Sequence, residues 1–166
     1  TPCGTLFPYT TLFRSGVDKI DRKILALLQE DATLSVAEIS RRVNLSPTPC
    51  WNRLKKLESA GVIAGRVALV VPEAVGLDLT VFVSIETHDH SRAWLERFAQ
   101  QVSAMPEVMD LYRMAGDVDY MLRVVVADMA AYDAFYQRLV TTFPLKNVTS
   151  RFAMQRLKAT TAYPLG

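Results

Sequence analysis

The apolar residues in the first third of the chain recur at the spacing of an α-helix. After Asp18, which stands at an N-cap position, one helical face consists of Ile20, Ile24, Leu27 and Leu28. Ser35 and Glu38 match a capping box, in which each side chain bonds to the backbone N–H of the other residue. A short second helix is therefore predicted, with an apolar face of Val36, Ile39 and Val43.

A third helix is predicted to follow a tight turn at residues 44–45, with Ser46 as its cap and its end at Gly61. Pro47 and Pro49 fall at its first and third positions, where backbone N–H groups have no partner inside a helix. The prolines therefore start this helix rather than break it. Its buried face is predicted to consist of Trp51, Leu54 and Leu57. We expect Trp51 to be part of the core rather than a base contact.

Two short helices joined by a tight turn, with a first helix behind them, form a helix-turn-helix. Residues 41–56 also hold five Lys or Arg residues and no acid. A recognition helix turns its leading end toward bases and its flanks toward phosphates, so Arg53 and Lys56 are expected to contact phosphates. The expected DNA contacts are Arg41, Arg42, Ser46, Thr48, Asn52, Arg53, Lys55 and Lys56. An ordinary solvated basic face is the alternative.

Beyond residue 62 the apolar pattern becomes alternating or continuous over short runs, as in β-strands. Strands are predicted at residues 63–71, 79–88, 108–116, 120–127 and 147–161. Ser91 and Asp128 are expected to cap two helices between these strands. From residue 79 the order is β-α-β-β-α-β, the ferredoxin-like split unit, so the fold class is α+β. The chain is expected to divide into a leader over residues 1–16, a winged helix-turn-helix domain over 17–62, a strand linker over 63–78 and a βαββαβ domain over 79–163.

Composition is that of a packed globular protein, since half the residues are apolar and 22% are charged. No apolar run approaches the ~18 residues of a membrane span, so no membrane association is expected. Residues 17–70 hold nine Lys or Arg against six Asp or Glu, whereas residues 71–166 hold nine against eleven. The excess of positive charge therefore lies in the first domain, which favours an anionic partner there.

The two cysteines, Cys3 and Cys50, form neither a disulfide framework nor a metal pattern, so a reducing cytoplasm is the expected location. Cys50 is expected to be apolar packing rather than a redox or ligand-sensing thiol. The first fifteen residues begin without Met, have no signal-peptide pattern and resemble a translated sequencing adaptor. We therefore expect residues 1–16 to be a non-native or disordered leader.

Polar residues in the second half of the chain are candidates for metal, ligand or catalytic sites. The run at residues 88–90, His-Asp-His, offers at most two metal ligands on one side of a strand, and a polar loop is favoured over a metal site. Asp117 and Asp119 either shape a tight turn or contact a ligand, and the two roles are compatible. No nucleophile–base pair, phosphate loop or metal set is evident, so an enzyme with an accessory domain is disfavoured and no cofactor is expected.

Two segments in this order are specific enough to suggest a family. LSPTPCWNRLKKLESAGVI at residues 45–63 and Gly-Asp-Val-Asp-Tyr at residues 116–120 resemble the Lrp/AsnC family of bacterial transcription regulators. The resemblance covers residues 17–163. Within the family, TPCWNRLKKLE, RMAGDVDYMLRV, VADMAAYDAFYQRLV and VTSRFAM resemble the branch that senses cysteine and controls its detoxification.

The resemblance implies an N-terminal DNA reader and a C-terminal domain that makes dimers and larger rings, with an amino-acid effector bound between C-terminal domains. By position, the effector site would involve Arg113, Gly116, Asp117, Asp119, Met129, Arg151, Phe152 and Ala153. Carboxylates could receive the ammonium group of an amino acid, and an arginine or turn N–H groups its carboxylate. The leucine-responsive branch carries apolar or aromatic residues at positions such as 113 and 151, so arginines there argue against leucine. The alternative is that these arginines pair with acids such as Glu86 or Asp110.

These observations together predict a cytoplasmic, nucleoid-associated regulator that binds double-stranded DNA and responds to a small amino acid, with cysteine the best candidate. It is expected to be a homodimer that forms a tetramer or octamer. The alternative function is a nucleoid-like architectural protein that binds many DNA sites with little effector control.

Overall fold

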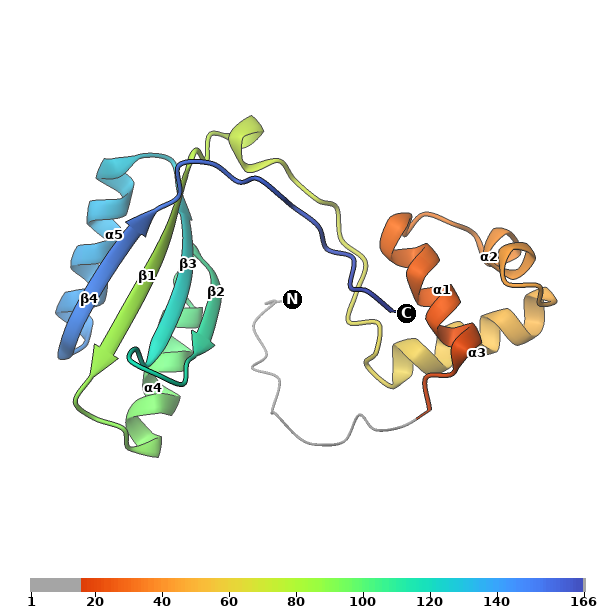
Figure 1. Ribbon diagram of the computed structural model, residues 1–166, viewed down its shortest axis with the longest axis horizontal. Coiled ribbons are helices and arrows are strands. Elements are labelled where there is room, and N and C mark those ends of the chain that lie inside the picture. The colour runs from red at the N-terminus through yellow and green to blue at the C-terminus, as the bar shows by residue number, and fades with distance from the viewer. Residues whose placement is uncertain (1–15, 166) are drawn as a thin grey trace. The chain divides into compact units, whose positions relative to one another are not determined.

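The computed structural model describes residues 16–165, so nearly all of the leader predicted over residues 1–16, Cys3 included, lies outside the described residues. The described chain forms two compact units (Figure 1). The helical unit comprises residues 16–69 together with residues 158–165, and the sheet unit comprises Val70–Leu157. Residues 158–165 therefore belong with the helices, although they follow the sheet unit along the chain.

The helical unit contains the three predicted helices: α1 (Lys19–Glu30), α2 (Val36–Arg42) and α3 (Pro47–Ser59). Asp18 caps α1 by accepting from two backbone N–H groups, and Ser35 and Glu38 form the predicted capping box at α2. Asn44, in the turn between α2 and α3, has a left-handed φ of 56°, which asparagine tolerates better than most residues. The buried core consists of Ile24, Ile39, Val43, Cys50, Leu54 and Leu57.

Two details of α3 differ from the sequence prediction. Trp51 is not in the core, because its side chain is 50% exposed. Cys50 is fully buried in its place, as predicted for a packing residue, since residues 50, 54 and 57 share the face of the helix that is turned inward. Ser46 occupies the N-cap position but its side chain makes no capping hydrogen bond. With proline at positions 47 and 49, few N–H groups remain at this helix start for a cap to satisfy.

The segment of residues 63–71, predicted as a strand, is not a strand in the structure. Its side chains alternate as a strand's would, but a strand requires a hydrogen-bonded neighbour, which sequence alternation cannot supply. Val67, Leu69 and Val70 are left largely exposed. The chain then enters a short 3₁₀ turn, Pro72–Val75, which Gly76 ends with a left-handed φ of 76°.

The sheet unit has the predicted β-α-β-β-α-β order: β1 (Leu79–Thr87), α4 (Arg92–Ser103), β2 (Val108–Arg113), β3 (Tyr120–Val126), α5 (Met129–Thr142) and β4 (Leu145–Phe152). The strands lie in the order β2-β3-β1-β4 and every neighbouring pair is antiparallel. Ser91 and Asp128 cap α4 and α5 as predicted. This α+β arrangement is the predicted ferredoxin-like unit.

Both helices of the sheet unit pack on one face of the sheet, which lies behind the strands in Figure 1. Alternate residues of β1 and β3 meet α4 and α5 in a core built around Val81, Val83, Ile85, Phe98, Leu122, Val124, Phe135 and Leu139. The predicted last strand is shorter than expected, because residues 153–161 are not in the sheet. The Ala153 N–H still donates to the Thr80 carbonyl, but β1 begins at Leu79, so no partner strand remains beyond that point.

Within the described residues, no helix has both the length and the apolar character needed to cross a membrane.

Candidate functional site

The exposed face of α3 carries polar, basic and aromatic side chains together. Thr48, Trp51, Asn52 and Lys55 are all exposed and fall at positions i, i+3, i+4 and i+7, so they lie on one side of the helix. We call these four residues the recognition face. The opposite side of α3 is held in the core by Cys50, Leu54 and Leu57. The helical unit therefore exposes these four side chains on a helix whose opposite side is buried.

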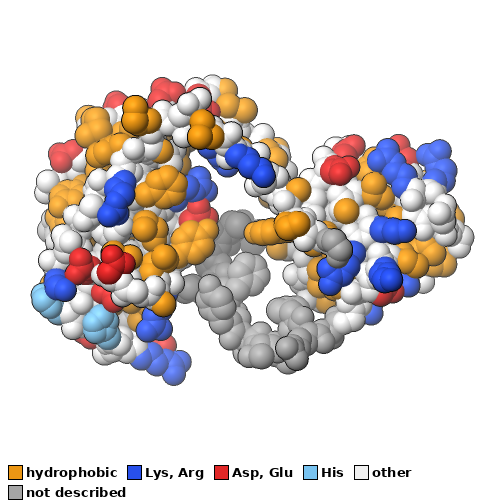
Figure 2. Space-filling model, in the orientation of Figure 1, with side chains coloured by type: hydrophobic (Ala, Val, Ile, Leu, Met, Phe, Trp, Pro, Cys, Tyr) orange, Lys and Arg blue, Asp and Glu red, His pale blue; other side chains and the backbone are white. Residues whose placement is uncertain are grey.

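Basic side chains flank the recognition face. Arg41 and Arg42 end α2 and are exposed, and Lys56 is exposed on the next turn of α3. Lys55 Nζ pairs with Glu58 Oε2 at 3.0 Å, and Arg66 Nη2 pairs with Glu58 Oε1 at 3.3 Å. Figure 2 shows Lys and Arg side chains distributed over the surface of the helical unit. Exposed ion pairs of this kind contribute little energy, so Lys55 remains available to a stronger anion.

Arg53 has a different environment from the other predicted DNA contacts. Its Nη1 donates to Asp18 Oδ2 at 2.6 Å and to Asp21 Oδ1 at 2.7 Å, both at the start of α1. Asp21 is almost fully buried, and these two carboxylates raise the pKa of the Arg53 guanidinium. Arg53 therefore joins α3 to α1. The sequence contains two acids, Asp18 and Asp21, at the start of the first predicted helix. Their presence suggests an ion pair there, but the sequence does not identify Arg53 as the partner.

The turn with Asp117 and Asp119 lies at one end of the sheet. Asp119 Oδ2 accepts from the Thr87 backbone N–H at 2.8 Å, and the Asp119 N–H donates to the Ile85 carbonyl at 2.9 Å. Gly116 has a φ of 134°, a conformation that side chains rarely allow. Asp119 thus fixes the turn against the end of β1, whereas Asp117 is exposed.

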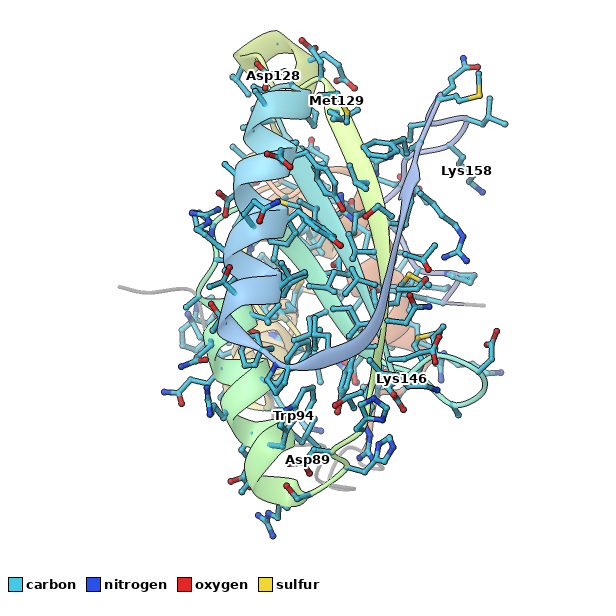
Figure 3. The ribbon with its side chains drawn as sticks, turned by 90° about the vertical axis from the view of Figure 1, so that its left-hand side faces the viewer. Asp89, Trp94, Asp128, Met129, Lys146 and Lys158 are labelled. Atoms are coloured by element: carbon cyan, nitrogen blue, oxygen red, sulfur yellow. The ribbon has the colours of Figure 1, made fainter. Side chains whose placement is uncertain are left out.

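The predicted effector residues form two groups at opposite ends of the sheet. Arg113 and the 116–119 turn adjoin the Ile85 end of β1, because Arg113 is opposite Tyr120 and Tyr120 is opposite Ile85. Phe152 is opposite Val81, four residues or about 13 Å away along β1. In Figure 3, Met129 lies at one end of the strands, and Lys146 and Asp89 at the other. A single copy of the sheet unit therefore does not bring the eight residues into one pocket.

The second group has two distinct parts. Phe152 packs edge-on against Tyr132 of α5 with ring centroids 5.2 Å apart, and Met129 is the half-exposed first residue of the same helix. Burial raises the pKa of the Tyr132 hydroxyl, which bonds to Ser150. Arg151 instead lies on the face of the sheet away from the helices, where its Nη1 donates to Ser84 Oγ at 2.5 Å. Ser84 is buried and was not predicted from the sequence, since the cross-strand register decides which side chain meets Arg151.

The ion pairs suggested for Arg113 and Arg151 are not formed. Asp110 binds Arg123 at 2.5 Å across β2 and β3, and Glu86 binds Lys146 at 2.9 Å.

The face of the sheet opposite α4 and α5 is partly apolar, and we call it the uncovered face. Cross-strand pairing places on it Phe82, Ser84, Asp110, Tyr112, Met121, Arg123, Thr149 and Arg151. Phe82 is 40% exposed and Tyr112 is 55% exposed. Figure 2, in the orientation of Figure 1, shows hydrophobic side chains gathered on this face beside charged ones. Such a surface is typical of a protein interface.

The His88-Asp89-His90 loop does not bring metal ligands together. His90 Nδ1 lies 3.7 Å from Asp119 Oδ1, while the Asp89 carboxylate accepts from the Ser91 N–H. Within residues 16–165, no group of three or more His, Cys, Asp or Glu side chains is arranged to hold a metal ion.

Comparisons with known proteins match both units of the chain. Residues 80–163 match the model of the Lrp/AsnC ligand binding domain, and residues 17–64 match a winged helix-turn-helix DNA-binding domain. The DNA-binding transcriptional activator DecR of Escherichia coli K12 is 55% identical over 150 residues, which are 90% of this chain and 99% of that protein. The glutamate uptake regulatory protein of Zymomonas mobilis is 46% identical, over 90% of this chain and 91% of that protein.

Solved structures agree with these matches. An AsnC family transcriptional regulator from Agrobacterium tumefaciens superimposes with a TM-score of 0.85 at 56% identity, covering 89% of this chain and 97% of that one. The transcriptional regulator NMB0573 from Neisseria meningitidis, solved as a complex with L-Met, superimposes with a TM-score of 0.82 at 37% identity, covering 90% of this chain and 97% of that one.

Proposed function

Because this chain belongs to the Lrp/AsnC family of transcriptional regulators, we propose that it binds specific DNA sites through the recognition face and that a small amino acid, cysteine first, controls its assembly or its DNA affinity. The observation that carries the proposal is the recognition face itself. It combines exposed base-contacting side chains with flanking cations on a helix fixed by its own core.

The DNA contacts divide into two kinds. Thr48 and Asn52 are suited to base edges, since an Asn side chain can bond to adenine through two hydrogen bonds. Arg41, Arg42 and Lys56, with Lys55 and the exposed Ser46 hydroxyl, are suited to phosphates. Arg53 contributes mainly by fixing α3 against α1, because its Nη1 already binds two carboxylates. Two recognition helices of a dimer would meet half-sites about one helical turn, ~34 Å, apart.

A second copy of the chain is the proposed occupant of the uncovered face. Phe82 and Tyr112 supply apolar area there, and the Arg123–Asp110 and Arg151–Ser84 contacts already satisfy the polar groups beside them. Burying paired polar groups costs less than burying unpaired ones. The exposed apolar linker residues Val67, Leu69 and Val70 also favour pairing between copies. A homodimer and larger assemblies of dimers are therefore part of the proposal.

The proposed effector site lies between copies of the sheet unit. One copy holds the two groups of effector residues about 10 Å or more apart along β1, so we infer that a residue from each group faces the same ligand across an interface. Asp117 would receive the ammonium group, and an arginine, Arg113 or Arg151, the carboxylate. The L-Met complex of the Neisseria meningitidis relative supports an amino acid as ligand. Cysteine is preferred because of the resemblance to the cysteine-responsive branch, and two arginines disfavour leucine.

The experiment that tests the DNA-binding proposal is selection of duplexes from a random pool by the purified protein, followed by titration of the selected duplex and a scrambled one at two salt concentrations. A specific regulator should prefer the selected duplex by about 10³-fold or more at physiological salt. An architectural protein would bind both duplexes with similar affinity. A protein that binds neither would contradict the proposal.

A further inference from the structure

Trp51 is a large aromatic residue of the recognition helix that the core does not bury. Half of its surface is open to solvent, although Cys50, Leu54 and Leu57 on the same helix are buried. Trp51 also lines an open groove of about 260 Å³ with Val36, Pro47 and Thr48. The groove lies between the start of α2 and the start of α3.

The lining of this groove is mainly apolar, because Val36, Pro47 and Trp51 supply three of its four residues and Thr48 is the fourth. The two helices that form the groove also carry the exposed basic side chains Arg41, Arg42, Lys55 and Lys56, and no acid occurs between residues 41 and 56. A ligand for the groove should therefore be a polyanion that carries a small apolar group.

Double-stranded DNA meets both requirements at one base. The C5 methyl of thymine is the apolar group that the major groove displays, and proteins recognise it through apolar contacts. Thr48 and Asn52 are neighbours of Trp51 on the recognition face. If α3 brings these two side chains to base edges in the major groove, the groove beside Trp51 also reaches the bases. An apolar peptide would fill the groove, but it would leave the basic side chains of α2 and α3 without an anionic partner.

We propose that Trp51, Val36, Pro47 and Thr48 form a seat for the C5 methyl of one thymine at a fixed position in each half-site. The inference rests on the proposed DNA-binding function and adds a specificity determinant to it. Thymine is then required at that position for its methyl group and not for its hydrogen bonds.

Deoxyuridine tests this directly, because it lacks only the methyl group and keeps every hydrogen bond of thymine. Each thymine of a duplex selected by the full-length protein is replaced in turn by deoxyuridine, and the affinity is measured by fluorescence anisotropy. One position in each half-site should lose about fourfold, the effect of withdrawing one methyl-sized group from an apolar contact. Thymines elsewhere should tolerate the change. This scan uses the unaltered protein, so it does not depend on the folding of any variant.

Two variants connect the methyl group to Trp51. Trp51→Ala should bind the thymine and deoxyuridine duplexes with equal affinity, and Trp51→Phe should retain part of the difference. Lys55→Ala is the matched control on the same helix: it should weaken binding to both duplexes by the same factor and keep the fourfold ratio.

Specific binding with no thymine sensitive to the loss of its methyl group would overturn the inference and leave the proposed function standing. A fourfold ratio that persists in Trp51→Ala would overturn it as well, because another residue would then hold the methyl group. Absence of any specific DNA binding would overturn the proposed function, and the inference with it.

Discussion

Arg53 of α3 and Asp21 of α1 form an ion pair across the helical unit, with Arg53 Nη1 at 2.7 Å from Asp21 Oδ1. The Asp21 side chain is only 3% exposed, and the same guanidinium also binds Asp18. The residue that the sequence marked as a phosphate contact thus fixes the orientation of the helix proposed to read DNA.

Removing the buried acid should therefore destabilise the helical unit. Asp21→Ala leaves Arg53 with one partner and removes the acceptor of the Asp18 N–H, so the free energy of unfolding should fall by about 1.5–3 kcal/mol, as for other hydrogen bonds to charged groups. Chemical denaturation would measure the loss of stability, and hydrogen exchange of the α1 and α3 amides would show that it lies in these helices. Lys55→Ala, which removes an exposed pair, is the control and should change stability by less than about 0.5 kcal/mol. Equal effects of the two variants would refute the structural role of the Arg53–Asp21 pair.

The flanking cations should control the salt dependence of DNA binding. Replacing Arg41, Arg42 or Lys56 by Ala should weaken binding to all sequences and reduce the slope of log affinity against log salt by about 0.9 for each phosphate that the variant no longer neutralises. Arg92→Ala is a suitable control, because Arg92 is a highly exposed arginine of α4 in the sheet unit. Slopes that stay unchanged in all three variants would mean that these residues do not contact phosphates.

Acid should destabilise the helical unit through its capping carboxylates. The Ser35 hydroxyl, followed by its backbone N–H, lowers the pKa of Glu38 from its ordinary value of 4.5. The Asp21 backbone N–H, followed by the Arg53 side chain, lowers the pKa of Asp18 from 3.8. A depressed pKa in the folded state gives stability that is present above the unfolded value and is lost as the pH falls through the folded one.

Hydrogen exchange should therefore accelerate for α2 amides as the pH falls below about 4.5 and for α1 amides below about 3.8, after correction for the intrinsic exchange rate. Glu38→Gln keeps a capping side chain that does not titrate in this range, so its decline in stability should be shallower. An identical decline in both proteins would show that Glu38 does not contribute.

These helix caps illustrate what the sequence could predict. Asp18, Ser35 and Asp128 cap the helices for which they were proposed, because capping depends on residues within four positions of one another. The order of the strands and helices in the sheet unit was predictable for the same reason, since strong local patterns mark each element. The order of these elements was enough to predict both the helix-turn-helix and the ferredoxin-like unit.

Features that depend on distant partners were not predictable. Trp51 has the spacing of a core residue, but the position of α1 decides which face of α3 is buried. Residues 63–71 have the alternation of a strand, but no strand among residues 16–165 pairs with them. Arg151 meets Ser84 only because β4 pairs with β1 in one register. For the effector residues, the sheet register separates the two groups that the sequence had placed in one site.

The uncovered face of the sheet should hold two copies of the chain together. Phe82→Ala removes an aromatic side chain from the middle of this face and should weaken association by roughly 2 kcal/mol, about 30-fold in the dissociation constant. Sedimentation velocity over a concentration series would measure the change. Gln100→Ala, on the exposed side of α4, is the control. Association that survives Phe82→Ala unchanged would place the interface elsewhere.

The effector response should depend on the exposed carboxylate of the 116–119 turn. Asp117→Asn keeps the shape of the side chain and removes the charge proposed to receive the ammonium group, so the amino acid should bind about tenfold or more weakly. DNA affinity without effector should be unchanged, because Asp117 makes no hydrogen bond that holds the turn within the described residues. Asp119→Asn is the comparison, since Asp119 anchors the turn to Thr87.

The most direct test of the account is the affinity for selected DNA, measured by fluorescence anisotropy with and without L-cysteine, then with L-methionine and L-leucine. A coupling of about 1–3 kcal/mol between effector and DNA would change the affinity about 5- to 150-fold, and by reciprocity DNA would change the affinity for cysteine by the same factor. The account predicts such a change with cysteine and a smaller or absent one with leucine. Specific DNA binding that no amino acid alters would contradict it.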